Sequence, residues 1–151
     1  MTSPGAELVA VYGRRRVGKT FLVRQHLRRD IQFELTGMHA ATLKLQLRNF
    51  AEALGRDLGQ GIRAEAPRSW LDAFGALGGA LERLPRRKRK RVLFLDEVPW
   101  LAGPRSGFLS AFEHFWNSWA SRRSDVVVIV CGSAASWLVK ELLHARGGLH
   151  N

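Results

Sequence analysis

The stretch from Gly13 to Thr20, which reads GRRRVGKT, restricts the fold of this chain more than any other feature. Glycine stands at its first and sixth positions, and lysine and threonine complete it. An apolar run, Leu8 to Tyr12, precedes the stretch, and a helix is expected to begin near Lys19. Glycines allow the backbone to turn sharply between a strand and a helix. This order of elements predicts an α/β domain.

Short apolar runs alternate with longer amphipathic segments along the rest of the chain, which supports the same fold class. The expected strands are residues 8–12, 31–35, 92–95 and 126–131. They are apolar on both faces, as strands of a parallel sheet covered by helices on each side are. The further helices are expected over residues 43–58, 70–84, 108–119 with a start at Ser106, and 134–144.

Length and composition fit one domain, residues 1–151. The chain is 46% hydrophobic, which is enough for a core and excludes intrinsic disorder. No apolar run approaches the ~20 residues of a membrane-spanning helix, and the amino terminus lacks the blocks of a secretory signal. The one cysteine, Cys131, excludes an internal disulfide and fits a reducing compartment. We therefore expect a cytoplasmic protein.

The pattern Gly-x-x-x-x-Gly-Lys-Thr is typical of loops that bind the phosphates of a nucleotide. Backbone N–H groups reach the phosphate oxygens, and the positive end of the following helix adds to the attraction. Lys19 is expected to contact the β- and γ-phosphates, and the Thr20 hydroxyl to hold Mg²⁺. The alternative is a plain glycine turn. The expected nucleotide-binding residues are Gly13, Arg14, Arg15, Arg16, Val17, Gly18, Lys19 and Thr20.

Two carboxylates end the third expected strand, because Asp96 and Glu97 directly follow the run Val92 to Leu95. Carboxylates at the carboxyl end of a parallel strand face the crevice where ligands bind. Asp96 is expected to hold Mg²⁺, and Glu97 to activate the water that attacks the γ-phosphate. Such a pair is often only a helix cap, but the phosphate-binding pattern upstream favours the catalytic interpretation.

A small polar residue also ends the fourth expected strand, in the sequence CGSAAS at residues 131–136. Ser133 is a candidate for sensing the γ-phosphate, and it completes the catalytic set with Lys19 and Glu97. The other interpretation is that Ser133 caps the next helix, with Gly132 as the turn. One hydroxyl can do both, so the two interpretations stay open.

The chain carries a formal net charge of +11, and much of the excess is concentrated before the third strand. A charge of this sign often indicates a nucleic-acid partner, and six cations in a row can bind the phosphates of DNA. The favoured alternative is a solvated loop after Pro85 that keeps the strand soluble. The six residues are Arg86, Arg87, Lys88, Arg89, Lys90 and Arg91.

Three of these segments, taken in order, resemble the prokaryotic, archaeal-type AAA ATPases, which are related to the signal-transduction ATPases with numerous domains. They are VYGRRRVGKT at 11–20, LDEVPWL at 95–101 and VCGSAASW at 130–137. The resemblance extends to FWNSW at 115–119 and GGLHN at 147–151. It implies a three-layer P-loop core that binds ATP and Mg²⁺ and hydrolyses ATP, with Asp96 at the metal and Glu97 as the base.

The resemblance also implies a strand order of 2-3-4-1-5 and a lid domain. Only seven residues precede the first expected strand, and the chain reaches Asn151 without a fifth strand or a lid. We therefore expect an incomplete core with strand order 2-3-4-1, which binds ATP with slow or absent turnover. Its first strand would be an open apolar edge, which predicts self-association.

The sequence does not decide which residue supplies the positive charge that speeds phosphoryl transfer. Arg122 and Arg123 either serve a neighbouring protomer or form a solvated helix end, which is the favoured interpretation. Two other functions stand beside the ATPase. One is a basic nucleic-acid-binding module, and the other is a non-functional ATPase fragment.

Overall fold

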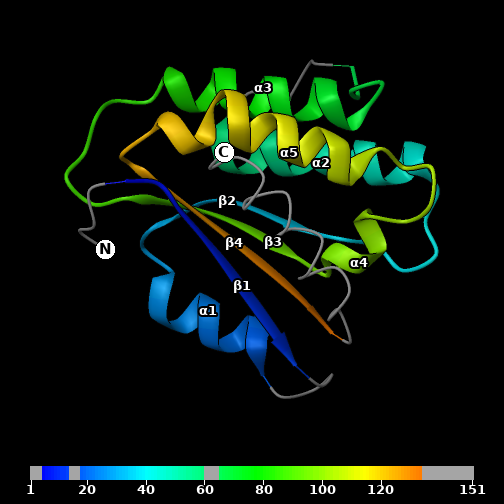
Figure 1. Ribbon diagram of the computed structural model, residues 1–151, viewed down its shortest axis with the longest axis horizontal. Coiled ribbons are helices and arrows are strands. Elements are labelled where there is room, and N and C mark those ends of the chain that lie inside the picture. The colour runs from blue at the N-terminus through cyan, green and yellow to red at the C-terminus, as the bar shows by residue number, and fades with distance from the viewer. Residues whose placement is uncertain (1–4, 14–17, 60–64, 134–151) are drawn as a thin grey trace.

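A parallel four-stranded sheet forms the centre of the computed structural model, which describes residues 5–13, 18–59 and 65–133 (Figure 1). Its strands are β1 (Glu7–Gly13), β2 (Ile31–Thr36), β3 (Arg91–Asp96) and β4 (Val126–Ser133). The helices are α1 (Lys19–Leu27), α2 (Leu43–Leu58), α3 (Trp70–Glu82), α4 (Val98–Leu101) and α5 (Phe108–Ser118), and a 3₁₀ turn covers Ala120–Arg122.

The strands lie in the order β1-β4-β3-β2, which confirms the expected order 2-3-4-1. β4 lies between β1 and β3, with Leu8 opposite Val128 and Leu93 opposite the same residue from the other side. Among the described strands β1 therefore has one neighbour, β4. Self-association through this edge stays a prediction.

Helices cover both faces of the sheet, as the three-layer prediction requires (Figure 1). On one face, α2, α3 and α5 enclose a large core with many aromatic rings, such as Phe74 stacked on Phe115 with ring centroids 5.0 Å apart. On the other face α1 contributes Val23, which packs over the centre of the sheet. Strands apolar on both sides are the expected result of this sandwich.

Side-chain caps explain where two of the helices begin. The Thr42 hydroxyl accepts a hydrogen bond from the Leu45 N–H at 3.2 Å, and the Ser69 hydroxyl accepts one from the Asp72 N–H at 3.1 Å. Each satisfies one of the N–H groups that a helix leaves unpaired in its first turn. After each cap, apolar residues recur with helical periodicity, and they form the buried face of the helix.

The structure differs from the sequence-based boundaries in small ways. Each strand is one or more residues longer than its apolar run, because main-chain pairing continues into polar residues. The helix expected from Ser106 begins at Phe108, after Gly107 with φ of 73°. The four-residue α4 was not predicted, since it is too short to show periodicity. The helix expected over residues 134–144 lies outside the described residues.

One ion pair beside β4 makes stability depend on pH. Arg123 donates to both carboxylate oxygens of Asp125, at 2.9 and 2.8 Å, and this hydrogen bonding lowers the pKa of Asp125 from 3.8. A carboxyl with a lowered pKa stabilises the fold above its unfolded pKa, and the contribution disappears as pH falls through the lower, folded value.

Asp125→Asn is therefore expected to cost about 0.5–1 kcal/mol at neutral pH, because the pair is partly exposed. The difference from the wild type should shrink below pH 3.8 as the native carboxyl becomes protonated. Urea unfolding at several pH values measures both effects. Glu113→Gln, at an exposed position on α5, is the control. A cost that does not change with pH would contradict the assignment.

Candidate functional site

The carboxyl ends of the four strands bring the predicted site residues to one edge of the sheet. Gly13 ends β1 opposite Ser133 of β4, and Asp96 ends β3 opposite Thr36 of β2. Helix α1 starts at the same edge, since Lys19 is its first residue. Segments that are far apart in the sequence therefore meet where open parallel sheets bind their ligands.

A direct contact joins the two main motifs. The Thr20 hydroxyl donates to Oδ2 of Asp96 at 2.6 Å, across 76 positions of sequence. Asp96 is 4% exposed, and its other oxygen, Oδ1, accepts from the Glu97 N–H at 2.9 Å. A buried carboxylate needs such partners, because its desolvation is otherwise costly. The two residues expected to hold a metal are thus in hydrogen-bond contact.

The turn into α1 has a backbone conformation that favours glycine. Gly18 is the N-cap residue, with φ of 75° and ψ of 23°, a left-handed conformation that side chains with a β-carbon rarely adopt. Its carbonyl accepts from the Leu22 N–H at 2.9 Å. Residues 14–17 and the side chains of Lys19 and Ser133 lie outside what the structure describes.

Glu97 occupies an unusual position directly after Asp96. Its backbone is left-handed, with φ of 52° and ψ of 43°, and it is the N-cap residue of the short helix α4. Such strain in a residue other than glycine is found often at functional sites. Its Oε2 atom is buried and has no hydrogen-bond partner within the described part of the chain. A buried carboxylate oxygen without a partner suits a ligand or a water molecule.

A close approach of two loops supports this turn, and the sequence did not predict it. Gly37, just after β2, donates its N–H to the Asp96 carbonyl at 2.9 Å. A β-carbon at Gly37 would overlap the Glu97 carbonyl oxygen and would lie 3.1 Å from Leu101. Only glycine therefore fits between the end of β2 and the turn that carries Glu97.

Gln46 of α2 fastens the same two loops and was also missed. It is buried, and its amide accepts from the Met38 N–H at 3.0 Å and donates to the Met38 carbonyl at 2.7 Å. The amide also reaches the carbonyl of Trp100 at 3.3 Å. The one available sequence signal was a polar residue on an otherwise apolar helix face.

The oxygen atoms at this edge fit the chemistry of Mg²⁺. Mg²⁺ is bound by one or two carboxylates or hydroxyls, with water and phosphate oxygens completing an octahedron. The Thr20 hydroxyl and the Asp96 carboxylate are such ligands, and their contact shows that they can reach a common point. They are therefore the residues that would hold the ion.

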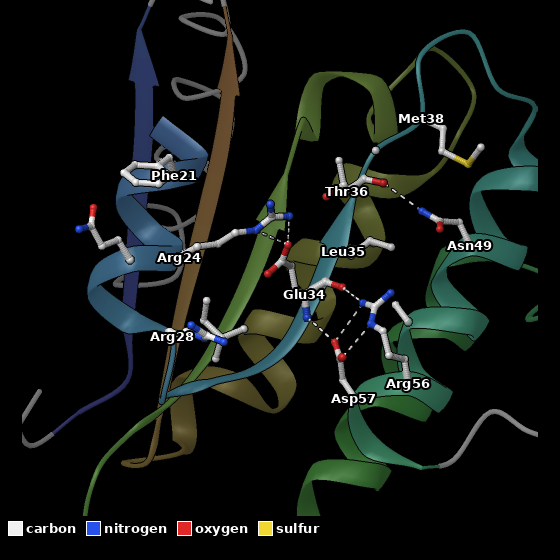
Figure 2. A pocket seen from close by; sticks show the side chains of 14 residues that line it. Phe21, Arg24, Arg28, Glu34, Leu35, Thr36, Met38, Asn49, Arg56 and Asp57 are labelled. Atoms are coloured by element: carbon white, nitrogen blue, oxygen red, sulfur yellow. Dashed lines mark hydrogen bonds and ion pairs between the residues drawn. The ribbon is translucent and has the colours of Figure 1, made fainter. Parts of the chain in front are cut away.

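A groove of about 970 Å³ follows the outer edge of β2 between α1 and α2 (Figure 2). Side chains of α2 form hydrogen bonds with the main-chain groups of this edge. Asp57 accepts from the Glu34 N–H, and Arg56 donates to the Glu34 carbonyl, both at 2.8 Å. Asn49 donates to the Thr36 carbonyl at 2.9 Å. The edge of β2 is therefore closed to pairing with another strand.

Four of the charged side chains that line this groove form two ion pairs. Arg24 on α1 turns toward Glu34, and Arg56 toward the adjacent Asp57 (Figure 2). Hydrogen bonding to Glu34 raises the pKa of Arg24. Thr36 and Gly37 also line the groove, so it extends to the edge where Thr20 meets Asp96.

The two arginines considered for charge compensation lie at the other end of the sheet. Arg122 ends the 3₁₀ turn, and Arg123 pairs with Asp125 just before β4 begins. Arg123 also lies over the ring of Trp119, 5.0 Å from the ring centre. Within one chain, neither residue reaches the carboxyl ends of the strands.

Comparison with known proteins identifies the family. A family model described as AAA domain matches residues 3–138, which is most of the chain. The chain belongs to the AAA domain family. This match confirms the resemblance to AAA ATPases drawn from the motifs, and it makes the protein a nucleotide-binding domain of the ATPase type.

Solved structures with the fold of this AAA domain share little sequence with it. A Walker-type ATPase of Pyrococcus abyssi is similar over 90% of the chain, at 20% identity and a TM-score of 0.62. A chain from a structure of Drosophila ORC bound to DNA is similar over 94%, at 17% identity and a TM-score of 0.53. The AAA domain spans 43% of the first chain and 24% of the second. No curated protein sequence matches it.

A search of the described helices of this AAA domain finds none that is long and apolar enough to cross a membrane.

Proposed function

We propose that this AAA domain binds Mg-ATP at the carboxyl edge of its sheet and hydrolyses ATP slowly as an isolated chain. The observation that carries the proposal is the contact between Thr20 and Asp96. It joins a phosphate-binding turn to an acidic strand end, which is the arrangement that phosphoryl transfer requires. The Pyrococcus abyssi ATPase, of similar fold, supports ATP as the nucleotide.

Each residue of the edge has a proposed task. Lys19 and the N–H groups of residues 13–20 hold the phosphates, and Thr20 and Asp96 hold Mg²⁺. The ion supplies positive charge to the phosphate oxygens. Glu97 accepts the proton of the attacking water, and Ser133 senses the γ-phosphate. The buried, unpartnered Oε2 of Glu97 supports its task, because an acceptor without a partner in the described part of the chain can bind water.

Turnover is proposed to be slow because Arg122 and Arg123, the two arginines considered for charge compensation, precede β4 and lie at the opposite end of the strands. A supplied arginine raises the rate of related enzymes about 10³- to 10⁵-fold. Arg123 is held by Asp125 at the opposite end of the strands. Binding is therefore a better test of the site than the rate of hydrolysis.

The experiment measures ATP affinity with and without Mg²⁺ by calorimetry. The wild type should bind more tightly with Mg²⁺, and Thr20→Val and Asp96→Asn should each lose at least about tenfold of that gain. Thr20→Ser keeps the hydroxyl and should retain the gain. Glu113→Gln on α5 is the control, because it changes an exposed carboxylate far from the site.

Thermal melting of the same variants separates loss of the ion from loss of the fold, because Asp96 is buried. The proposal fails if folded Thr20→Val and Asp96→Asn keep the full effect of Mg²⁺.

DNA binding through residues 86–91 stays a prediction, and so does the alternative of a non-functional ATPase fragment. The similar fold of the ORC chain, seen in a structure bound to DNA, supports a test of DNA binding. A rise in melting temperature on addition of Mg-ATP would contradict the fragment hypothesis.

A further inference from the structure

The amino ends of the strands form a second charged edge, opposite the one that holds Thr20 and Asp96. Cations precede three neighbouring strands, namely Arg28 and Arg29 before β2, residues 86–91 at β3, and residues 122–123 before β4. The strands are parallel, so these segments meet at one end of the sheet, on the left in Figure 1.

Main-chain hydrogen bonds hold these three segments side by side. The Val92 N–H donates to the Asp30 carbonyl, and the Arg91 N–H donates to the Asp125 carbonyl, both at 2.8 Å. The cations before the three strands are therefore neighbours in space, although they come from distant parts of the sequence.

Four residues of the six-residue basic run have partners inside the protein; one of them, Arg89, pairs with Asp30, and the other three are Arg87, Lys90 and Arg91. Arg87 donates to the carbonyls of Arg89 and Lys90, at 3.0 and 2.8 Å. Lys90 donates to the Gly5 carbonyl and is 4% exposed. Arg91 is 5% exposed, and it donates to Gln32 at 2.7 Å and to the Pro85 carbonyl. These three residues shape the loop and are not free to bind a ligand.

A buried carboxylate fixes the loop against the end of α1. The Asp30 side chain is 7% exposed, and it accepts from Arg87 at 3.2 Å and from Arg89 at 2.6 Å. Asp30 therefore holds two cations of the loop on the segment that begins β2. Those two arginines compensate its negative charge, so Asp30 does not neutralise the other cations of this edge.

Four cations of this edge remain exposed, without a hydrogen bond or ion pair in the described part of the chain. We call them the amino-edge cations, and they are Arg28, Arg29, Arg86 and Lys88. The first pair directly follows α1, and the second pair flanks Arg87 in the loop that Asp30 fixes to it. Like charges held together in this way repel unless an anion lies against them.

We propose that the amino-edge cations bind the phosphate backbone of duplex nucleic acid, at a site separate from the nucleotide site. Guanidinium groups suit phosphate oxygens, which they contact through two N–H groups at once. The large apolar side chains that are exposed in the described chain lie outside the three basic segments. They are Phe21, Leu22, Met38, Leu43, Leu45 and Leu71. Their absence from the three basic segments favours backbone contacts with a duplex over the stacking of single-stranded bases.

The same lack of exposed apolar residues disfavours a membrane, which peripheral proteins enter with large apolar side chains. Binding is expected to depend on salt and not on base sequence, because backbone contacts carry no sequence information.

The experiment titrates the full chain into a labelled duplex of about 20 base pairs and follows fluorescence anisotropy at several salt concentrations. The test variant replaces the four amino-edge cations together, as Arg28→Gln, Arg29→Gln, Arg86→Gln and Lys88→Gln. The control variant removes the same charge from exposed positions away from this edge, as Lys44→Gln, Arg48→Gln, Arg68→Gln and Arg105→Gln.

The test variant is expected to lose at least about tenfold in affinity, and its slope of log affinity against log salt should fall by about 3 to 4. The control variant should stay within about threefold of the wild type. Equal losses in the two variants would overturn the proposal, because they would reflect net charge alone.

Two further measurements distinguish the amino-edge cations from the nucleotide site and from a membrane-binding surface. Lys19→Ala should keep duplex affinity, because it acts at the opposite edge; a loss equal to that of the test variant would overturn a separate site. Vesicles of phosphatidylserine and phosphatidylcholine should bind both four-residue variants equally. A test variant that loses vesicle binding and keeps duplex binding would assign the edge to a membrane and overturn the proposal.

Discussion

Lys19→Ala is expected to weaken Mg-ATP binding roughly 10- to 100-fold. Hydrogen bonds to a charged group contribute about 1.5–3 kcal/mol each, which corresponds to this range of affinity. Lys19 is the first residue of α1, directly after Gly18 with its left-handed backbone, so the substitution leaves the turn intact. Calorimetric titration with Mg-ATP measures the affinity of both proteins.

Lys44→Ala is the matched control, since it removes a lysine from an exposed position near the start of α2. Its affinity should equal that of the wild type. Equal affinity of Lys19→Ala and wild type would exclude phosphate binding by the glycine-rich turn, and with it the proposed function.

Gly37→Ala is expected to destabilise the fold by about 2–3 kcal/mol, in the upper part of the ~1–3 kcal/mol that adding a methyl group to a filled site costs. The new β-carbon would overlap the Glu97 carbonyl oxygen, and main-chain atoms on both sides cannot move independently. For a domain of this size, the melting temperature should fall by about 4–10 °C. Mg-ATP affinity should fall as well, because the turn next to Asp96 must shift.

Gly75→Ala on α3 is the matched control, because a β-carbon there meets no atom within 4 Å. Alanine in a helix interior is favoured over glycine by about 0.5–1 kcal/mol, so this variant should melt slightly higher than the wild type. If Gly37→Ala melts like Gly75→Ala, the close approach of the two loops is wrong.

Much of the fold followed from local sequence patterns. The four apolar runs predicted the four strands because a strand buried on both faces needs no contribution from distant residues to be recognised. The contact between Thr20 and Asp96 was not visible as such, but it follows from parallel strands whose carboxyl ends share one edge. The glycine pattern predicted a turn between a strand and a helix, and Gly18 lies in that turn with a left-handed backbone.

Contacts between distant loops were beyond the reach of such patterns. Gly37 and Gln46 act on the Glu97 turn through main-chain atoms, which carry no sequence signature. The burial of residues in the basic run was also not predictable from local patterns. Six equal charges in a row gave no hint that Lys90 and Arg91 are buried, since their burial depends on partners at Gly5, Gln32 and Pro85.

Strand β3 has a consequence for how the two charged edges coexist. It runs from Arg91 to Asp96 with every residue buried. At a rise of about 3.3 Å per residue its ends lie about 17 Å apart, roughly twice the Debye length of ~8 Å at physiological salt. Anions held at the two ends therefore repel each other only weakly. The proposed nucleotide site and the proposed nucleic-acid site are therefore compatible in one chain, with β3 separating them.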